Sequence, residues 1–474
     1  MVFSSILFIL FFLPAFILTY YLVPKKLKNI VILVFSIVFY SWGGPRFIFV
    51  ILGTTFIDFH LVKWMSRMKE QRYRRWLLAL SVSINLGLLC YFKYSNFFIE
   101  NVNAVLSLMG THQIQWTKLV LPIGISFYTF ETITYVVDVY RRVHKPLDNF
   151  WSYQLYIIFF PKLIAGPIIR YHDLADQIED RSKDETVDNI LIGFYRFAIG
   201  LAKKVLIANQ MGLYADTVFA LNYADLGTHA AWMGIIAYTF QIYFDFSGYS
   251  DMAIGIAKMV GFKFPENFNN PYISQSITEF WRRWHISLGA WMRNYLYIPL
   301  GGNRVATQRR LYLNLWLVFL ASGLWHGASW SFVLWGAYHG LFLVLERGFL
   351  LKLYEKIGKI PSMLITFFVV VIGWVFFRIE NIADAFVFLK RLFVFESGNS
   401  NLFDSEFYCY LVIALIFSFI TIFKFGKKWQ DSIYFNEYTN KKHITVFVLT
   451  LVLLLFSIAS ITAFGFNPFI YFRF

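Results

Sequence analysis

The feature that most limits the fold of this chain is a series of long apolar blocks, the clearest of which cover residues 3–23, 76–98 and 444–463. Each block has close to the ~20 residues that a helix needs to cross about 30 Å of hydrocarbon. A helix satisfies its own backbone hydrogen bonds in lipid, and the sequence lacks the short alternating segments of a membrane β-barrel. We therefore expect an all-α, polytopic integral membrane protein.

Composition and charge agree with this expectation. Only 15% of the 474 residues are charged, against roughly a quarter in a soluble protein. The formal net charge is +15, but the basic residues lie in short loops between apolar blocks, which argues against nucleic acid as a partner. Basic loops of this kind face the cytoplasm. They contain Lys25, Lys26 and Lys28, then Arg67, Lys69, Arg72, Arg74 and Arg75, then Arg141, Arg142 and Lys145.

The first apolar block has no basic residue before it and no small-residue cleavage site after it. We interpret it as an uncleaved membrane segment with its N-terminus outside. Because no organelle address is present, the expected location is a bacterial cytoplasmic (inner) membrane, which the chain crosses several times.

We predict roughly ten to twelve transmembrane helices, with re-entrant and interfacial helices, in a single domain over residues 1–474. The predicted segments lie at about 3–23, 29–43, 46–64, 76–98, 118–140, 190–208, 229–260, 311–345, 361–378, 407–424 and 444–463. Residues 150–170 are apolar but broken by Pro161 and by Gly166-Pro167. Irregular backbone at membrane depth needs protein or a cavity around it, so this stretch indicates a re-entrant segment on the cytoplasmic side. The charged residues 171–189 are expected to form a loop.

A further helix is expected to begin at Ser276, because Ser276 and Glu279 have the spacing of a capping box. In that helix Arg282 and Arg293 would share one face, and a second face would hold Trp281, Trp284, His285, Leu288 and Met292. An aromatic face beside a basic one is typical of a helix at the membrane interface. The alternative is that the guanidinium groups of Arg282 and Arg283 bind the phosphates of a ligand.

His326 lies in the apolar block 311–345, where a histidine is costly unless it has a partner, so it is a candidate functional residue. Gly323 and Gly327, like Gly336 and Gly340, have the four-residue spacing that lets helices approach closely. A glycine beside His326 would also leave room for a narrow substrate. The alternative is a buried histidine bonded to a neighbouring helix, and that is our expectation for His339.

Carboxylates inside apolar blocks form a second group of candidates. Asp245 and Asp251 could line a polar channel or relay protons, and Glu131 and Asp138 allow the same interpretation. We favour the alternative that adjacent serines and a tyrosine hydrogen-bond to them.

Sequence motifs of several other classes of enzyme are absent. The sequence has no Walker A loop, no HExxH motif and no GxSxG elbow. Cys90 and Cys409 lie far apart in apolar surroundings, so neither a disulfide framework nor a metal site is expected. A lone catalytic histidine remains the simplest chemistry.

Four stretches together are similar to motifs of the membrane-bound O-acyltransferase family, over a core at about 120–345. The resemblance is closest to the alginate and peptidoglycan O-acetyltransferase branch, with teichoic acid D-alanyl transferases as more distant relatives. The stretches are 160–167 (FPKLIAGP), 244–251 (FDFSGYSD), 280–288 (FWRRWHISL) and 324–327 (LWHG), and the ending 469–474 (FIYFRF) also looks like this branch.

The resemblance implies a ring of helices around a central tunnel, with His326 as the catalytic histidine and His285 as a second histidine on the cytoplasmic side. It implies a cytoplasmic thioester donor, acetyl-coenzyme A, as a substrate and no permanently bound cofactor. It also implies an extracytoplasmic polysaccharide acceptor, reached through a partner with an SGNH-hydrolase-like fold. The donor-binding candidates are Arg282, Arg283, Trp281 and Trp284, and the candidates for tunnel-lining or structural roles are Asp245, Ser247, Ser250, Asp251, Ser322 and Gly327.

Two other functions stay open on the sequence. A secondary transporter or flippase would suit the broken segment at Pro161 and the buried Asp245 and Asp251, although the paired broken helices of such proteins are not visible. A non-catalytic scaffold of a glycan-secretion complex would need the apolar blocks but not His326.

Overall fold

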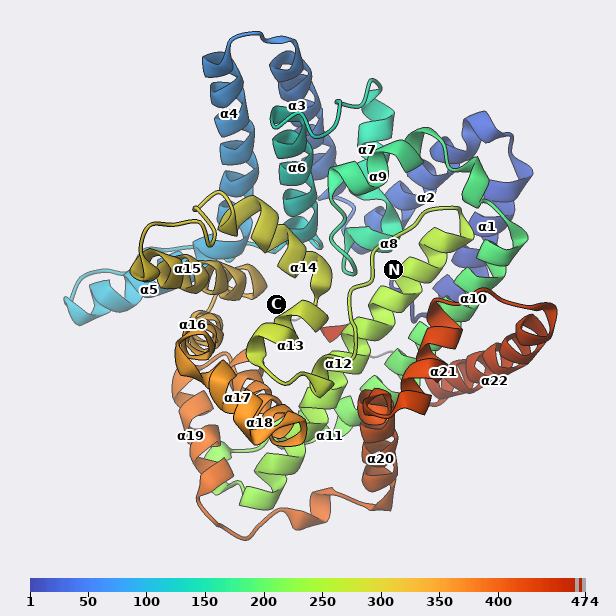
Figure 1. The fold of residues 1–474 in the computed structure, drawn as a ribbon. Coiled ribbons are helices and arrows are strands. Elements are labelled where there is room, and N and C mark those ends of the chain that lie inside the picture. Colours follow the sequence, from blue (N-terminus) through green and yellow to red (C-terminus); the bar gives the residue numbers. More distant parts are fainter. Residues whose placement is uncertain (465–468, 471–474) are drawn as a thin grey trace. The chain divides into compact units, whose positions relative to one another are not determined.

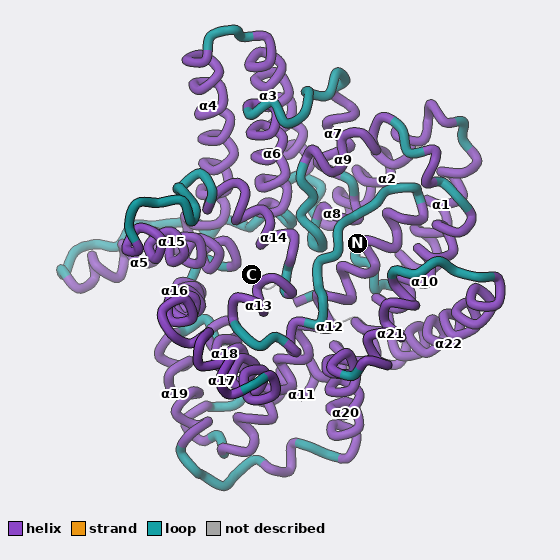
Figure 2. The backbone as a smooth tube through the Cα atoms, viewed as in Figure 1, coloured by secondary structure: helices purple, strands orange, loops and turns teal. Residues whose placement is uncertain are grey.

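The computed structural model describes residues 1–464 and 469–470. These residues form helices joined by loops, with no strand among them (Figure 2). Six of the described helical segments are long and apolar enough to cross a membrane, and a shorter apolar helix covers Phe8–Leu22. The six are Lys25–Gly43, Ile48–Arg67, Gln71–Leu108, Lys359–Arg378, Ser405–Ile422 and Asn440–Ala463. The all-α fold is confirmed, whereas ten to twelve transmembrane helices and a tunnel stay predictions.

The chain divides into two compact units. The first comprises Met1–Ile190 and Ile256–Phe264, and the second comprises Leu191–Gly255 and Pro265–Phe474. That all of 1–474 forms one membrane domain therefore stays an expectation from the sequence.

In the first unit α3, α4 and α6 pack side by side (Figure 1). The predicted segment at 118–140 begins later than expected, because Gly124 has a φ of +77° and starts α6 at the next residue. Residues 171–179, expected to be loop, form a helix that buries Tyr171, Leu174 and Ile178 on one face. The helices are α1 (Leu13–Leu22), α2 (Lys28–Gly43), α3 (Ile48–Arg67), α4 (Gln71–Leu89), α5 (Ser95–Leu108), α6 (Ile125–Tyr140), α7 (Phe150–Ile158), α8 (Phe160–Leu163) and α9 (Tyr171–Glu179).

The basic loops of the first unit are linked to one another. Arg74, in the first turn of α4, donates a hydrogen bond to the Tyr140 carbonyl oxygen at the end of α6 (2.8 Å). His144 Nε2, in the loop that follows α6, lies 2.9 Å from the Asp176 carboxylate in α9. These contacts are expected if the loops share one side of the membrane.

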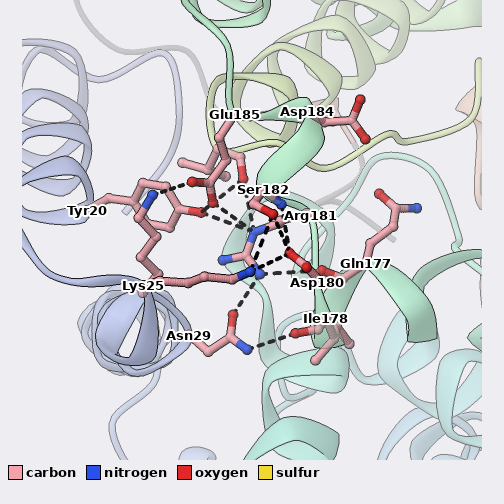
Figure 3. Close-up of polar contacts among 12 residues, drawn as sticks. Tyr20, Lys25, Asn29, Gln177, Ile178, Asp180, Arg181, Ser182, Asp184 and Glu185 are labelled. Carbon is pink, nitrogen blue, oxygen red and sulfur yellow. Dashed lines mark hydrogen bonds and ion pairs between the residues drawn. The ribbon is translucent and has the colours of Figure 1, made fainter.

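Figure 3 shows that the first basic loop also contacts residues 177–185, at the end of α9 and directly after it. Lys25 forms an ion pair with Asp180 at 2.9 Å, and Arg181 donates to the Asn29 side-chain oxygen at 2.7 Å. The Ser182 backbone N–H, together with Lys25, holds the pKa of the Asp180 carboxyl well below its usual range. This connection therefore stays charged well into the acid range.

The broken segment at 150–170 is irregular, as predicted. α7 ends at Ile158, and after one residue α8 begins, with Pro161 in its first turn where proline is tolerated. Lys162 in α8 is fully buried and forms an ion pair with Glu131 of α6, which is also buried. Its ammonium group lies 4.5 Å from the centroid of the Tyr156 ring. The segment is thus anchored to α6 by paired charges.

The second unit contains the remaining helices, and the predicted block 311–345 is two helices rather than one. The helices that run through or lie in this unit are α10 (Val187–Ala202), α11 (Asn209–Phe219), α12 (Thr228–Met259), α13 (Ile277–Arg283), α14 (Ile286–Trp291), α15 (Gln308–His326), α16 (Trp330–Leu345), α17 (Leu351–Ile357), α18 (Lys359–Arg378), α19 (Ile382–Phe393), α20 (Ser405–Phe419), α21 (Lys424–Tyr434) and α22 (Asn440–Phe464).

Glycines let α15 and α16 pack as a tight hairpin. A Cβ atom on Gly323 would lie 2.3 Å from the Phe332 carbonyl oxygen, and one on Gly336 would lie 2.4 Å from that of Phe319. The close helix approach predicted from the four-residue glycine spacing is therefore confirmed.

A second glycine contact joins α10 to α12. A Cβ atom on Gly200 would lie 2.5 Å from the Gly248 carbonyl oxygen, and one on Gly255 would lie 2.6 Å from that of Gly193. The close approach brings Arg196 of α10 within hydrogen-bonding distance of the Asp251 carboxylate on α12.

Candidate active site

His326 is the last residue of α15, and only 4% of its surface is exposed. Its imidazole packs against Trp325, Phe377 and Trp335, with ring centroids 4.9, 5.1 and 5.2 Å away. Phe377 comes from α18 and Trp335 from α16, so three helices fix the ring. The imidazole therefore lies at the end of α15 that carries partial negative charge.

His285 lies where the expected continuous helix breaks. α13 ends at Arg283, His285 has a φ of +45°, and α14 begins at Ile286. The predicted shared face of Trp281 through Met292 is therefore wrong. The physical reason is a competing hydrogen bond, since the Asn267 carbonyl oxygen accepts from the Ile286 N–H at 2.9 Å.

The start of α13 is as predicted and is reinforced by a distant residue. Ser276 Oγ accepts a hydrogen bond from the Glu279 N–H at 3.0 Å, which caps the helix. The Glu346 carboxylate accepts a second bond, from the Thr278 N–H at 2.9 Å. These two caps position the short helix that carries Arg282.

The Asn267 side chain holds His285. Its oxygen lies 3.1 Å from His285 Nδ1 and accepts from Ser287 Oγ at 2.8 Å, while its nitrogen donates to Ser250 Oγ at 3.0 Å. An amide oxygen only accepts, so Nδ1 carries the proton and Nε2 keeps the lone pair. Burial lowers the pKa of His285 to about 3, and the imidazole is therefore neutral at physiological pH.

The two histidines are joined through one tryptophan. The Trp325 ring lies 6.0 Å from the ring of His285 and 4.9 Å from that of His326. The structure thus brings together the two residues predicted to be catalytic, from segments 41 positions apart in the sequence.

The predicted donor-binding residues fall into different environments. Arg282 is exposed and forms no ion pair among the described residues. Arg283, by contrast, is bound to Glu279 at 2.8 Å and donates to the Asn269 carbonyl oxygen at 3.1 Å. Arg282 is therefore the better placed of the two to meet a ligand phosphate.

The two tryptophans of this group belong to an aromatic core. Trp284 is 2% exposed and packs on Trp374 with ring centroids 4.9 Å apart. Trp281 lies 5.0 Å from the ring of His339 and 5.4 Å from that of Trp335. Their contacts support α13 from within the unit.

Three of the buried carboxylates form ion pairs with Lys or Arg instead of the expected bonds to adjacent residues, and the fourth, Asp138, contacts a histidine. Asp251 lies 2.7 Å from Arg196 and 2.6 Å from Lys203, and Asp245 lies 2.8 Å from Lys204. In the first unit Glu131 pairs with Lys162, and Asp138 lies 2.7 Å from His172. A buried carboxylate is stabilised far more by an opposite charge than by a hydroxyl, which explains the difference.

The remaining polar candidates have varied surroundings. Ser322 is buried one helical turn before His326, and Ser250 accepts from Asn267 as described. Ser247 is 2% exposed, and its hydroxyl forms no hydrogen bond among the described residues. A Cβ atom on Gly327 would lie 2.0 Å from the Phe332 ring, so the space expected beside His326 is filled by that ring.

Two residues of the terminal motif 469–474 pack beside these groups. The Ile470 N–H donates to the Asp245 carboxylate at 2.8 Å, and the Phe469 ring stacks on Tyr249 at 4.7 Å. Residues 471–474 lie outside the described residues.

Asn267 and the cations Arg196, Lys203 and Lys204 were not predicted from the sequence. Nothing in the local sequence singles out Asn267, because its partners lie 17 to 20 positions away. The cations did carry a signal. Residues 193, 196, 200 and 203 repeat glycine and cation at helical spacing, and the glycines and carboxylate at 248, 251 and 255 match them.

The chain was compared with models of known protein families. The model of the MBOAT, membrane-bound O-acyltransferase family, matches residues 6–379. The chain belongs to this family. The match confirms the family resemblance seen in the sequence, and with the named relatives it confirms the predicted O-acyltransferase activity.

Relatives of this membrane-bound O-acyltransferase carry related names. A protein of Pseudomonas aeruginosa named "Probable alginate O-acetylase AlgI" is 46% identical over 397 residues, covering 83% of this chain and 75% of that protein. A Pseudomonas putida protein of the same name is 42% identical over 494 residues, covering 100% of both chains. The peptidoglycan O-acetyltransferase of Helicobacter pylori is 37% identical over 425 residues, covering 83% of this chain and 80% of that protein.

The Asn267→Ala substitution is expected to lower the kcat of this O-acyltransferase about 100-fold with little change in KM. The reason is that a reacting group misplaced by about 1 Å can lower the rate by that factor. The change frees His285 Nδ1 and Ser287 but leaves the backbone bond to Ile286. Asn314→Ala is the matched control, since Asn314 is equally buried and donates to the Leu300 carbonyl oxygen at 3.2 Å. A kcat within twofold of the wild-type value for Asn267→Ala would show that Asn267 does not position His285.

Proposed function

We propose that this chain moves an acetyl group from a cytoplasmic thioester, acetyl-coenzyme A, to a hydroxyl group of an exported polysaccharide. The observation that carries the proposal is the aromatic-walled His326 joined through Trp325 to a second, neutral histidine. The names of the relatives support acetyl transfer to alginate-like polysaccharide or peptidoglycan. We further propose a bacterial inner membrane with the N-terminus outside.

In the proposed reaction His326 acts as general base and acid. Its imidazole takes the proton of the attacking hydroxyl while that oxygen forms a bond to the acetyl carbon, and it returns the proton to the thiolate that leaves as the carbon–sulfur bond breaks. General acid–base help of this kind contributes about 10²–10⁴-fold, and positioning supplies much of the rest. His285 is proposed to act beside it as a neutral acceptor through Nε2.

The proposed donor site follows from the charge of the donor, and the proposed partner follows from the side of the membrane on which the acceptor lies. The nucleotide end of coenzyme A is too charged for hydrocarbon, and the exposed Arg282 is proposed to bind its phosphates. The acceptor is outside the membrane, where a partner with an SGNH-hydrolase-like fold is proposed to complete the transfer. The transporter alternative gains no support, since Asp245 and Asp251 are both neutralised by cations.

The test is O-acetylation of exported glycans in a cell from which this chain has been deleted and then restored. We expect O-acetyl groups on one exported polysaccharide to disappear on deletion and to return with the wild-type chain. Unchanged O-acetylation of alginate-like polymers, peptidoglycan and every other exported glycan would rule the proposal out.

A further inference from the structure

The turn between α3 and α4 joins two helical segments that are each long and apolar enough to cross a membrane, Ile48–Arg67 and Gln71–Leu108. It forms the tip of a helical hairpin (Figure 1). Only Met68, Lys69 and Glu70 separate the two helices. A connection this short cannot extend far from the membrane surface, so the side chains at the two helix ends lie at the level of the lipid headgroups.

This turn carries exposed cations that the protein does not neutralise. One cation ends α3, one lies between the helices, and two lie near the start of α4. They are Arg67, Lys69, Arg72 and Arg75, and none of them forms an ion pair among the described residues. Residues 63–76 contain a single carboxylate, Glu70. The turn is therefore strongly positive.

On each helix an exposed tryptophan lies one turn deeper in the membrane than an exposed arginine. Trp64 of α3 is 56% exposed and precedes Arg67 by three residues. Trp76 of α4 is 66% exposed and follows Arg72 by four residues. Residues at this spacing share a helix face, and a rise of about 1.5 Å per residue separates each pair by about 4–6 Å along the axis. Because the helices run in opposite directions, both tryptophans lie on the membrane side of the cations.

The loop that follows α6 adds a further cation beside this turn. Gln71 donates to the Tyr140 hydroxyl and the buried Arg74 donates to the Tyr140 carbonyl oxygen, both at 2.8 Å, so the start of α4 is bound to the end of α6. Arg142 follows two residues later, with a φ of +59° that is uncommon for a residue with a side chain. It is exposed and also forms no ion pair within the part of the chain that the structure describes.

The charge and the depth of these groups indicate which partner fits them. Guanidinium groups bind phosphate oxygens in bidentate geometry. Tryptophan favours the boundary between the acyl chains and the headgroups of a membrane. A free phosphate ion would meet the cations but leave Trp64 and Trp76 uncovered, whereas a phospholipid meets both. A zwitterionic phospholipid carries a cation beside its phosphate, so an anionic phospholipid fits the positive turn better.

We propose that the α3–α4 turn is a binding surface for anionic phospholipid, with Arg72 and Arg75 on the headgroup phosphate and Trp64 and Trp76 against the acyl chains. This interaction is separate from the transfer of acyl groups. A lipid that binds the folded protein stabilises it, so the thermal stability of the protein would depend on the anionic lipid around it.

The test uses the purified full-length protein in an uncharged detergent, titrated with phosphatidylglycerol or with phosphatidylcholine. Binding is measured as lipid-induced thermal stabilisation. The variant combines Arg72→Gln with Arg75→Gln, and the matched control combines Arg309→Gln with Arg310→Gln. The control arginines are also exposed, without an ion pair in the described part of the chain, and close to the start of a helix, α15. They are followed four residues later by leucine and asparagine rather than tryptophan.

We expect the Arg72→Gln, Arg75→Gln variant to lower the preference for phosphatidylglycerol over phosphatidylcholine about 25-fold. The reason is that each basic residue near an anionic membrane surface contributes about fivefold to binding. The thermal stability without added lipid should not change, because neither side chain is bound within the protein. Arg72→Lys combined with Arg75→Lys keeps both charges and should keep most of the preference, as should the Arg309→Gln, Arg310→Gln control.

Three results would overturn the proposal. Equal losses in the two glutamine variants would show that the total charge of the protein, rather than this turn, sets the lipid preference. Displacement of the lipid by inorganic phosphate, but not by sodium chloride of the same ionic strength, would identify a site for free anions. Normal phosphatidylglycerol binding by Arg72→Gln, Arg75→Gln, together with reduced glycan O-acetylation in cells, would indicate an acidic protein as the partner. Lipid binding is measured without acetyl transfer, so a failure here leaves the proposed function in place.

Discussion

His326→Ala is expected to lower glycan O-acetylation by about 10²–10⁴-fold at equal membrane abundance, because it removes the general acid–base contribution. The imidazole packs against the rings of Trp325, Phe377 and Trp335, so the effect of the lost packing needs a control of its own. The measurement is the amount of O-acetyl released from the exported glycan per unit of protein in the membrane.

His339→Ala is the control for that experiment. His339 is fully buried on the neighbouring helix α16 and packs on the same Trp335, with ring centroids 5.1 Å apart. If a packing defect caused the loss, both variants would share it. We expect His339→Ala to keep activity within about tenfold, and equal losses in the two variants would remove His326 from the chemistry.

Lys162→Met is expected to destabilise the protein by about 3–5 kcal/mol, because it leaves the Glu131 carboxylate buried without its partner. Both members of this pair are buried, with 0% and 1% of their side chains exposed. The measurement is the thermal unfolding of the purified protein in detergent. Glu131→Gln combined with Lys162→Met should recover most of the loss, since no buried charge then remains.

Lys118→Met is the matched control for the buried pair. Lys118 and Glu100 also form an ion pair, at 2.9 Å, but their side chains are 78% and 58% exposed. Pairs of that kind contribute about 0–1 kcal/mol. Equal effects of Lys162→Met and Lys118→Met would show that the buried pair does not anchor the segment at 150–170.

Local patterns predicted much of the fold. The apolar blocks located the helices, the Ser276 and Glu279 spacing predicted the start of α13, and the glycine spacing predicted the α15–α16 contact. Each of these features depends on residues within one or two helical turns. Sequence spacing reports such features directly.

The candidate site was predicted only in part, because its geometry depends on distant partners. His326 was predicted as a site residue from its motif and stays a prediction, but its place at the end of α15 follows from the extended backbone of Gly327. The break at His285 has no local signal, since Trp281 to Met292 keep helical spacing and the competing acceptor is the Asn267 carbonyl oxygen. The partners of Asp251 are Arg196 on α10 and Lys203 directly after it, 55 and 48 positions away in the sequence.

The most direct test of the account follows the acetyl group itself in inside-out membrane vesicles that contain the whole glycan-export system. Acetyl-coenzyme A labelled in the acetyl group is supplied to the exposed cytoplasmic face, with an ionophore present to abolish ion gradients. The account predicts release of the free coenzyme A thiol and label on glycan inside the vesicles, both absent with His326→Ala. An intact thioester, or transfer that the ionophore abolishes, would contradict it and favour a scaffold or a transporter.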